Sequence, residues 1–190
     1  MLPRRDRIQL TELMLLDVLE AFRAAGMISW CFVVSSDRNA RILARNAGAN
    51  FIAEARDRGV NASVLTGIGE TRSAPSTMVV PSDIPTLVSE DISNALARKH
   101  VFDVVISPSH SCDGTNLLFF SRTHVPALRY DSDSFWNHLR QVAKSGSSLA
   151  VTSGAGILFD VDTPEDLLEL CLTESKSGRF AAEALKRHCC

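Results

Sequence analysis

The sequence has no apolar run long enough to cross a lipid bilayer, and residues 1–9 are charged rather than hydrophobic. We therefore expect neither an export signal nor a membrane anchor, and a cytoplasmic location. The five cysteines form no C-x-x-C motif and no even disulfide framework, which indicates reduced thiols and an exposed pair at 189–190. The five histidines lack the H-x-x-x-H or Cys/His spacing that zinc prefers, which argues against a zinc enzyme.

The chain also has little net charge. Its 190 residues include 20 basic and 22 acidic side chains, for a formal net charge of −2. No global field therefore attracts nucleic acid or an acidic membrane, and any anionic ligand has to be captured locally. The length suits one domain with one large core, residues 1–190, and no internal repeat, low-complexity tract or linker interrupts it.

Short apolar runs alternate with segments of helical periodicity along the chain. Helices are predicted over 10–22, 38–46, from 59 onward, 89–99, 135–143, 164–172 and 179–186. Strands are predicted over 28–34, 51–53, 77–80, 101–106, 117–120 and 156–159. This alternation predicts an α/β fold with a mostly parallel sheet.

Three acids follow predicted strands. Asp83 comes after the strand 77–80, and Asp160 and Asp162 come after the strand 156–159. In an open parallel sheet the carboxyl ends of the strands face the ligand crevice. Carboxylates gathered there suit magnesium, which one or two protein acids usually hold together with substrate phosphates. The sequence therefore predicts a site for metal-bound phosphate chemistry.

Each of these acids also has a structural interpretation. Asp83 could be a turn residue before Pro85, although we favour the ligand role. Asp162 stands just before Pro164, in the ordinary sequence of a helix start, so capping is the better interpretation for it alone. Capping does not explain Asp160, because no cap is needed two residues earlier. A charge at the end of a buried strand is costly unless it is paired or bound to metal. Its functional interpretation is favoured.

Other polar segments are ambiguous when taken singly. The loop Asp113–Asn116 offers backbone amides, a hydroxyl and a side-chain amide, which suit a phosphate or carboxylate but also an ordinary turn. The segment Ser132–Ser134 precedes a helix and could cap it or hold an anion. Asn61, after Gly59, fits a common turn pattern. His138 lies in a predicted amphipathic helix, where a partly buried structural histidine is the simpler interpretation.

Taken in order, these segments resemble one family. They are D-V-L (Asp17–Leu19), G-x-N (Gly59–Asn61), S-D-I-P-T-L (Ser82–Leu87), D-G-T-N (Asp113–Asn116), S-F-x-x-H (Ser134–His138) and D-V-D-T-P-E-D-L (Asp160–Leu167). The set is similar to 2-phospho-L-lactate guanylyltransferases and their relatives acting on phosphoenolpyruvate or 3-phosphoglycerate, enzymes of deazaflavin coenzyme biosynthesis. The S-D-I-P-T-L element is shared with nucleotidyltransferases generally, whereas the last element is the sharpest.

The resemblance implies a Rossmann-like nucleotidyltransferase (GT-A-like) fold with three layers, α/β/α. It implies that the phosphate of a phosphorylated acid attacks the α-phosphorus of GTP and that pyrophosphate leaves. Magnesium would be held by Asp83, Asp160 and Asp162, which are also the implied catalytic residues. The implied residues for the acid are Gly114, Thr115, Asn116 and Ser134, and those toward the nucleotide are Gly59 and Asn61.

The sequence also departs from the family. The family begins with a strand and a P-x-K…A-K-S-R-L loop that receives the triphosphate, and nothing here corresponds, so we expect a central strand to be absent. An uncovered sheet edge would favour a homo-oligomer. Asp113 and Asp131 stand where the family commonly has glycine, and an acid repels a bound phosphate. Two alternatives therefore stay open: a nucleotidyltransferase with another nucleotide or acceptor, and a noncatalytic relative that binds a phosphorylated metabolite or a protein partner.

Overall fold

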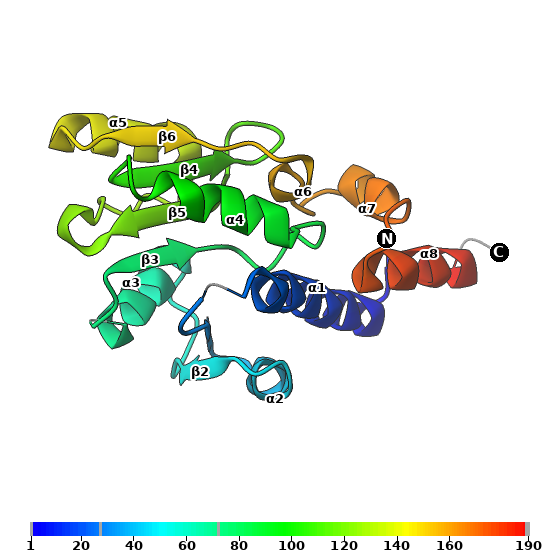
Figure 1. The fold of residues 1–190 in the computed structure, drawn as a ribbon. Coiled ribbons are helices and arrows are strands. Elements are labelled where there is room, and N and C mark those ends of the chain that lie inside the picture. Colours follow the sequence, from blue (N-terminus) through cyan, green and yellow to red (C-terminus); the bar gives the residue numbers. More distant parts are fainter. Residues whose placement is uncertain (1, 27, 72, 189–190) are drawn as a thin grey trace.

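The chain folds into helices that cover both faces of a four-stranded β-sheet, with a separate two-stranded sheet beside it (Figure 1). The computed structural model describes residues 2–26, 28–71 and 73–188. The helices are α1 (Arg4–Ala25), α2 (Arg38–Asn46), α3 (Val60–Glu70), α4 (Ser89–Arg98), α5 (Ser134–Ser145), α6 (Ala155–Leu158), α7 (Pro164–Leu170) and α8 (Lys176–His188), with a short 3-10 helix at Arg122–His124. The strands are β1 (Phe32–Ser35), β2 (Asn50–Ala53), β3 (Ser76–Val79), β4 (Val104–Pro108), β5 (Thr115–Ser121) and β6 (Leu149–Val151).

The larger sheet has four strands in the order β3-β5-β4-β6. β4 and β6 are parallel, whereas β5 is antiparallel to both β3 and β4. Three strands therefore share one direction and β5 runs against them. β1 and β2 form a separate parallel pair. The prediction of an α/β fold with mostly parallel strands is confirmed.

Two hydrophobic clusters lie on opposite faces of the larger sheet. Successive side chains of a strand point to opposite faces, so Val105 and Phe119 pack toward α1 and α4, while Ile106 and Phe120 pack toward α5. Both faces of β4 and β5 are buried, as expected for strands with continuous apolar runs. The result is the three-layer α/β/α arrangement (Figure 1).

One strand prediction is wrong. The run 156–159 does not form a strand, because residues Ala155–Leu158 form the helical turn α6, and the strand of this region is β6, several residues earlier. Asn116 stabilises the turn: its side-chain Nδ2 donates to the carbonyls of Ile157 and Leu158 at 3.0 and 3.2 Å. Periodicity alone cannot distinguish a short apolar run in a strand from one in a helix. Asp160 therefore follows a helical turn rather than a strand.

A polar contact ties the first helix to the last. The carboxylate of Asp17, in α1, is buried and accepts hydrogen bonds from the backbone N–H groups of Lys176 and Ser177 at 3.0 and 2.9 Å. It also accepts one from the Ser177 hydroxyl at 2.6 Å. These donors belong to the first turn of α8, whose N–H groups have no partners within the helix. Asp17 therefore has a structural role as a distant cap of α8.

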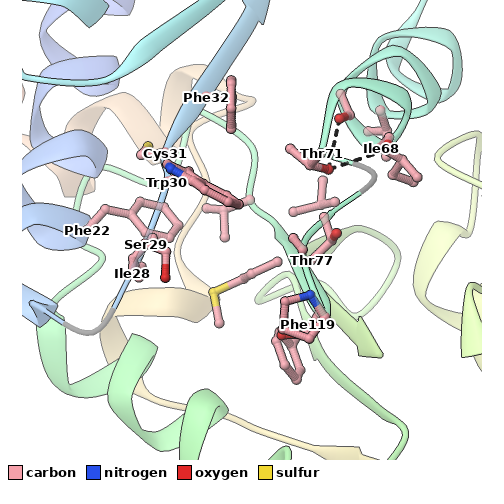
Figure 2. Close-up of a pocket in the computed structure, with 18 of the residues that line it drawn as sticks. Phe22, Ile28, Ser29, Trp30, Cys31, Phe32, Ile68, Thr71, Thr77 and Phe119 are labelled. Carbon is pink, nitrogen blue, oxygen red and sulfur yellow. Dashed lines mark hydrogen bonds between the residues drawn. The ribbon is translucent and has the colours of Figure 1, made fainter. Parts of the chain in front are cut away.

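β1 and β3 belong to different sheets, since β1 pairs with β2 and β3 pairs with β5. A cavity of about 480 Å³ lies between them, lined by consecutive residues of both segments, 28–32 and 73–80. β1 contributes Phe32 and Val34, which lie on one face of that strand, whereas β3 contributes all four of its residues, Ser76–Val79. Figure 2 shows Trp30 and Phe32 on one side of it and Thr77 and Phe119 on the other.

Within the described ranges, no helix combines the length and the apolar composition needed to span a membrane. Cys31, Cys112 and Cys171 are free thiols, whereas the cysteine pair at 189–190 lies outside the described residues. Burial raises the pKa of the Cys31 and Cys171 thiols. Since the thiolate is the nucleophile, neither of these two is activated for catalysis.

Candidate active site

The structure brings the two acidic segments together. Asp83 lies between β3 and α4, and Asp160 and Asp162 lie between α6 and α7. The backbone N–H of Val161 donates to the carbonyl of Asp83 at 3.0 Å, which joins the segments directly. Asp160 is buried, Asp83 is half-buried and Asp162 is exposed. Acids from two segments that are distant in sequence thus form one cluster with a solvent-facing side.

Burial and neighbouring negative charges disfavour the charged forms of Asp83 and Asp162. Burial raises the pKa of Asp83 to about 6, and the neighbouring charges of Asp162 and Asp160 add to the shift. Partial desolvation also raises the pKa of Asp162, and the charges of Asp160, Asp166 and Asp113 act in the same direction. Like charges that destabilise each other's ionised forms are relieved by a cation. The cluster is therefore suited electrostatically to a positively charged ligand.

His110, on the loop between β4 and β5, contacts this cluster. Its Nδ1 lies 3.0 Å from Asp160 Oδ1, and its Nε2 lies 3.6 Å from Asp166 Oδ1. The hydrogen bond with Asp160 raises the pKa of His110. Sequence reasoning missed this residue, because the contact joins residues 50 positions apart and no motif around His110 predicts it.

The start of α7 shows which residue caps that helix. Thr163 is the capping residue: its hydroxyl accepts from the backbone N–H of Asp166 at 3.2 Å. In return Asp166 Oδ2 accepts from the N–H groups of Thr163 and Asp162 at 2.7 and 3.0 Å. Burial opposes ionisation of Asp166, but these hydrogen bonds outweigh it and lower its pKa. The interpretation of Asp162 as the cap is therefore wrong, and its carboxylate is not used by the helix.

The loop before β5 is held together by its own side chains. The Asp113 carboxylate accepts from the hydroxyls of Ser111 and Ser109, and these hydrogen bonds lower the pKa of Asp113. The N–H of Gly114 donates to Ser109 Oγ at 2.9 Å, so this amide is used inside the loop. A Cβ on Gly114 would lie 3.0 Å from Ser109 Oγ and 3.7 Å from Asp160 Oδ2. The loop therefore packs directly beside the acid cluster.

Thr115 and Ser134, the two hydroxyls implied for the acid substrate, lie next to this loop. The Ser134 hydroxyl donates to Thr115 Oγ1 at 3.0 Å, and both residues are buried. The N–H of Phe135 donates to the Asp113 carbonyl at 3.2 Å, which fixes the start of α5 against the loop. The hydroxyl pair is thus held against the loop that packs beside the acid cluster.

The other implied ligand residues make contacts within the chain. The Asn116 side chain holds α6 through the two carbonyls described above. Asn61 Oδ1 accepts from the N–H of Tyr130 at 2.9 Å, and its Nδ2 donates to Asp131 Oδ1 at 3.2 Å, which ties α3 to the segment before α5. Gly59 precedes α3 with a φ of 83°, a backbone conformation that favours glycine. Their roles toward substrate and nucleotide stay predictions.

The site lacks a preformed metal cage. Among the described residues, no three His, Cys, Asp or Glu side chains are grouped closely enough to hold a metal ion by themselves. Carboxylate oxygens beside a pair of hydroxyls instead suit a ligand that carries both a cation and phosphate groups. Phosphoryl transfer is chemistry of this kind, because it needs positioning and charge neutralisation rather than a protein nucleophile.

Comparison with known proteins agrees with this chemistry. The family model described as "Guanylyl transferase CofC like" matches residues 1–188. The chain is 34% identical to a 3-phospho-D-glycerate guanylyltransferase from Phenylobacterium zucineum, over 95% of this chain and 84% of the relative. It is 31% identical to a 2-phospho-L-lactate guanylyltransferase from Methanothermobacter thermautotrophicus (96% and 79%) and 30% identical to a phosphoenolpyruvate guanylyltransferase from Conexibacter woesei (87% and 74%).

Solved structures show the same fold at low sequence identity. A crystal structure described as a "putative nucleotide-diphospho-sugar transferase" from Desulfovibrio desulfuricans G20 matches with a TM-score of 0.74 and 16% identity, covering 97% of this chain and 86% of that one. A 4-diphosphocytidyl-2C-methyl-D-erythritol synthase from Anaerococcus prevotii matches with a TM-score of 0.63 and 11% identity, covering 82% and 86%. The expected Rossmann-like nucleotidyltransferase fold is confirmed. Because the family model and these relatives match most of its length, the chain belongs to the CofC-like guanylyltransferase family and is a nucleotidyltransferase.

Proposed function

We propose that this protein transfers GMP from GTP to the phosphate of a phosphorylated hydroxy acid and releases pyrophosphate. The observation that carries the proposal is that the acid cluster packs against the loop that leads directly into the hydroxyl pair Thr115 and Ser134. The acids suit a metal-bound triphosphate, and the hydroxyls suit an acid that carries a phosphate. The family membership supports the choice of guanylyl transfer.

Asp83, Asp160 and Asp162 are the residues that would hold magnesium. Their carboxylate oxygens are the hard ligands that magnesium prefers, and their mutual repulsion favours a cation. When bound, the ion supplies positive charge that neutralises the phosphate oxygens during displacement. The lack of a three-residue cage is compatible with magnesium, which usually keeps waters and substrate phosphates among its ligands.

The chain needs no general base for this reaction, because a phosphate nucleophile is already ionised at neutral pH. Thr115 and Ser134 would bind and orient the phosphorylated acid with Gly114 and Asn116, and Gly59 and Asn61 would lie toward the nucleotide. The charge of Asp113 is already hydrogen-bonded to its own loop. Asp113 therefore repels a bound phosphate less than an unpaired carboxylate would.

The acceptor is one of three acids named for the relatives: 3-phosphoglycerate, 2-phospho-L-lactate or phosphoenolpyruvate. The product would be the acid joined to guanosine through a pyrophosphate link, and we propose deazaflavin coenzyme biosynthesis as its pathway, because the family that the sequence resembles serves it.

The test is pyrophosphate release with magnesium and GTP across the three acids, with ATP and CTP as nucleotide controls and Asp160→Asn as the matched inactive variant. We expect pyrophosphate release to require GTP, magnesium and one of the acids. Asp160→Asn should abolish this release. Release with ATP or CTP instead would overturn the guanylyl assignment. No release from a folded wild-type protein would favour the noncatalytic alternative.

A further inference from the structure

A buried chain of hydrogen bonds ends on Thr115. His138, in α5, is completely buried, and its Nδ1 lies 3.1 Å from Thr115 Oγ1. The Ser134 hydroxyl donates to the same oxygen at 3.0 Å. On the far side of the ring, the backbone N–H of Arg129 donates to His138 Nε2 at 2.9 Å. The ring of Tyr130 packs edge-on against the imidazole, with 4.8 Å between the ring centroids.

These contacts determine which nitrogen of His138 carries the proton. Nε2 accepts a hydrogen bond from a backbone N–H, which can only donate, so Nε2 carries no proton. Burial lowers the pKa of His138 to about 4, although a hydrogen bond with the Ser134 backbone acts in the opposite direction, so the ring is neutral at physiological pH. A neutral imidazole with a bare Nε2 has its proton on Nδ1. His138 Nδ1 is therefore a donor, and the Thr115 oxygen is its acceptor.

Counting protons shows that one donor is left over. His138 Nδ1, Ser134 Oγ and Thr115 Oγ1 carry three protons between them, and the two contacts among these atoms use two. Thr115 Oγ1 accepts in both contacts, so the remaining proton is its own. No acceptor for that proton is found among the described residues. Thr115 directly follows Gly114, where a Cβ would lie 3.7 Å from Asp160 Oδ2, so its backbone is one residue from the loop's contact with the acid cluster.

We propose that His138 is a positioning residue that fixes Thr115 as an obligatory hydrogen-bond donor to the phosphorylated acid. The proposal rests on the proposed function of this site. Because both lone pairs of Thr115 Oγ1 are occupied, this hydroxyl accepts nothing from a ligand. It therefore selects an acceptor oxygen of a phosphate or carboxylate and disfavours a ligand hydroxyl in that position. His138 itself does not touch the ligand.

A purely structural role for His138 makes a different prediction. In that case the important contact is the one from Arg129 to Nε2, which holds the segment before α5 against the helix. The two roles use different ring nitrogens, and two substitutions separate them. The amide nitrogen of His138→Asn can take the place of Nδ1 and keep the donor to Thr115. The longer His138→Gln places its amide near Nε2, where its oxygen can accept from Arg129, and loses the donor to Thr115.

The experiment measures binding of 3-phosphoglycerate, 2-phospho-L-lactate and phosphoenolpyruvate by calorimetry with wild type and both variants, each checked by circular dichroism and thermal unfolding. We expect His138→Asn to bind the preferred acid within about threefold of wild type and His138→Gln to lose about tenfold or more, the scale of a hydrogen bond to a charged group. In the transfer assay the same loss should appear in KM for the acid.

Thr115→Val serves as an independent variant, because it removes the spare proton directly and does not depend on the folding of the His138 variants. It should weaken acid binding by the same factor as His138→Gln, and the double variant should lose no more than either single one, since both remove one interaction. Three outcomes would overturn the proposal. They are equal acid binding by all variants, better binding by His138→Gln than by His138→Asn, and no binding of any acid by wild type. Acid binding without pyrophosphate release would instead overturn only the proposed function.

Discussion

Asp83→Asn should stabilise the protein at neutral pH while it removes the proposed metal ligand. In the folded chain burial, together with Asp162 and Asp160, raises the Asp83 pKa from 3.8 to about 6. The folded state therefore binds more protons than the unfolded state between these two values. Stability falls as the pH rises through that window, and above about pH 6 the full penalty is present. Asparagine has nearly the same shape and carries no charge, so it escapes this penalty.

The size of the effect follows from the shift. At about 1.36 kcal/mol for each pKa unit, the shift corresponds to about 3 kcal/mol at pH 8 and about 1 kcal/mol at pH 4.5. For a chain of this length, 3 kcal/mol corresponds to roughly 6–12 °C in Tm. Urea unfolding of wild type and Asp83→Asn at both pH values measures the difference directly.

Glu174→Gln, a change at an exposed acid in the loop between α7 and α8, controls for the general loss of one negative charge. Added magnesium should stabilise wild type more than Asp83→Asn, because a bound cation removes the same repulsion. If Asp83→Asn were no more stable than wild type at pH 8, or if its gain did not shrink toward pH 4.5, the assignment of Asp83 as a destabilised, half-buried carboxylate would be wrong.

Three further predictions test the site and its frame. Asp160→Asn should lower turnover by about 100-fold or more, the scale for loss of one preorganised electrostatic group, with an unchanged circular dichroism spectrum; full activity would exclude Asp160 as a ligand. Asp17→Ala should cost about 1–3 kcal/mol of unfolding free energy in urea, because it leaves the first N–H groups of α8 without their acceptor, and turnover per folded molecule should not change. Gly156→Ala should destabilise by about 1–3 kcal/mol, since a Cβ there would lie 2.3 Å from the Thr86 carbonyl oxygen; a neutral result would mean that α6 shifts freely.

Local patterns in the sequence were enough for several elements. The helix at 38–46 begins after Asp37, whose carboxylate accepts from the N–H of Asn39, and both ends of the helix agree with the prediction. The apolar run of β4 is buried on both faces, as its composition requires. The ordered motifs also identified the family correctly, because a set of motifs in a fixed order is more specific than any one of them and does not depend on the lengths of the loops between them.

Local patterns failed where distant segments decide the conformation. Residues Ala155–Leu158 form a helical turn because Asn116, about 40 positions earlier, binds the carbonyls of Ile157 and Leu158. The assignment of the α7 cap to Asp162 failed for a local reason, because Pro164 in the first helical position and Asp166 three residues after Thr163 make Thr163 the capping residue.

The sequence by itself determined the alternation of strands and helices, the family, and the three acids of the proposed metal site, because apolar periodicity and residue order are properties of the chain. Only the tertiary structure decided how those acids interact, that His110 contacts them, and that His138 lies within hydrogen-bond distance of Thr115. The physical reason is that pKa shifts and tautomers depend on distances of a few ångströms between residues tens of positions apart. Spacing along the chain does not encode those distances.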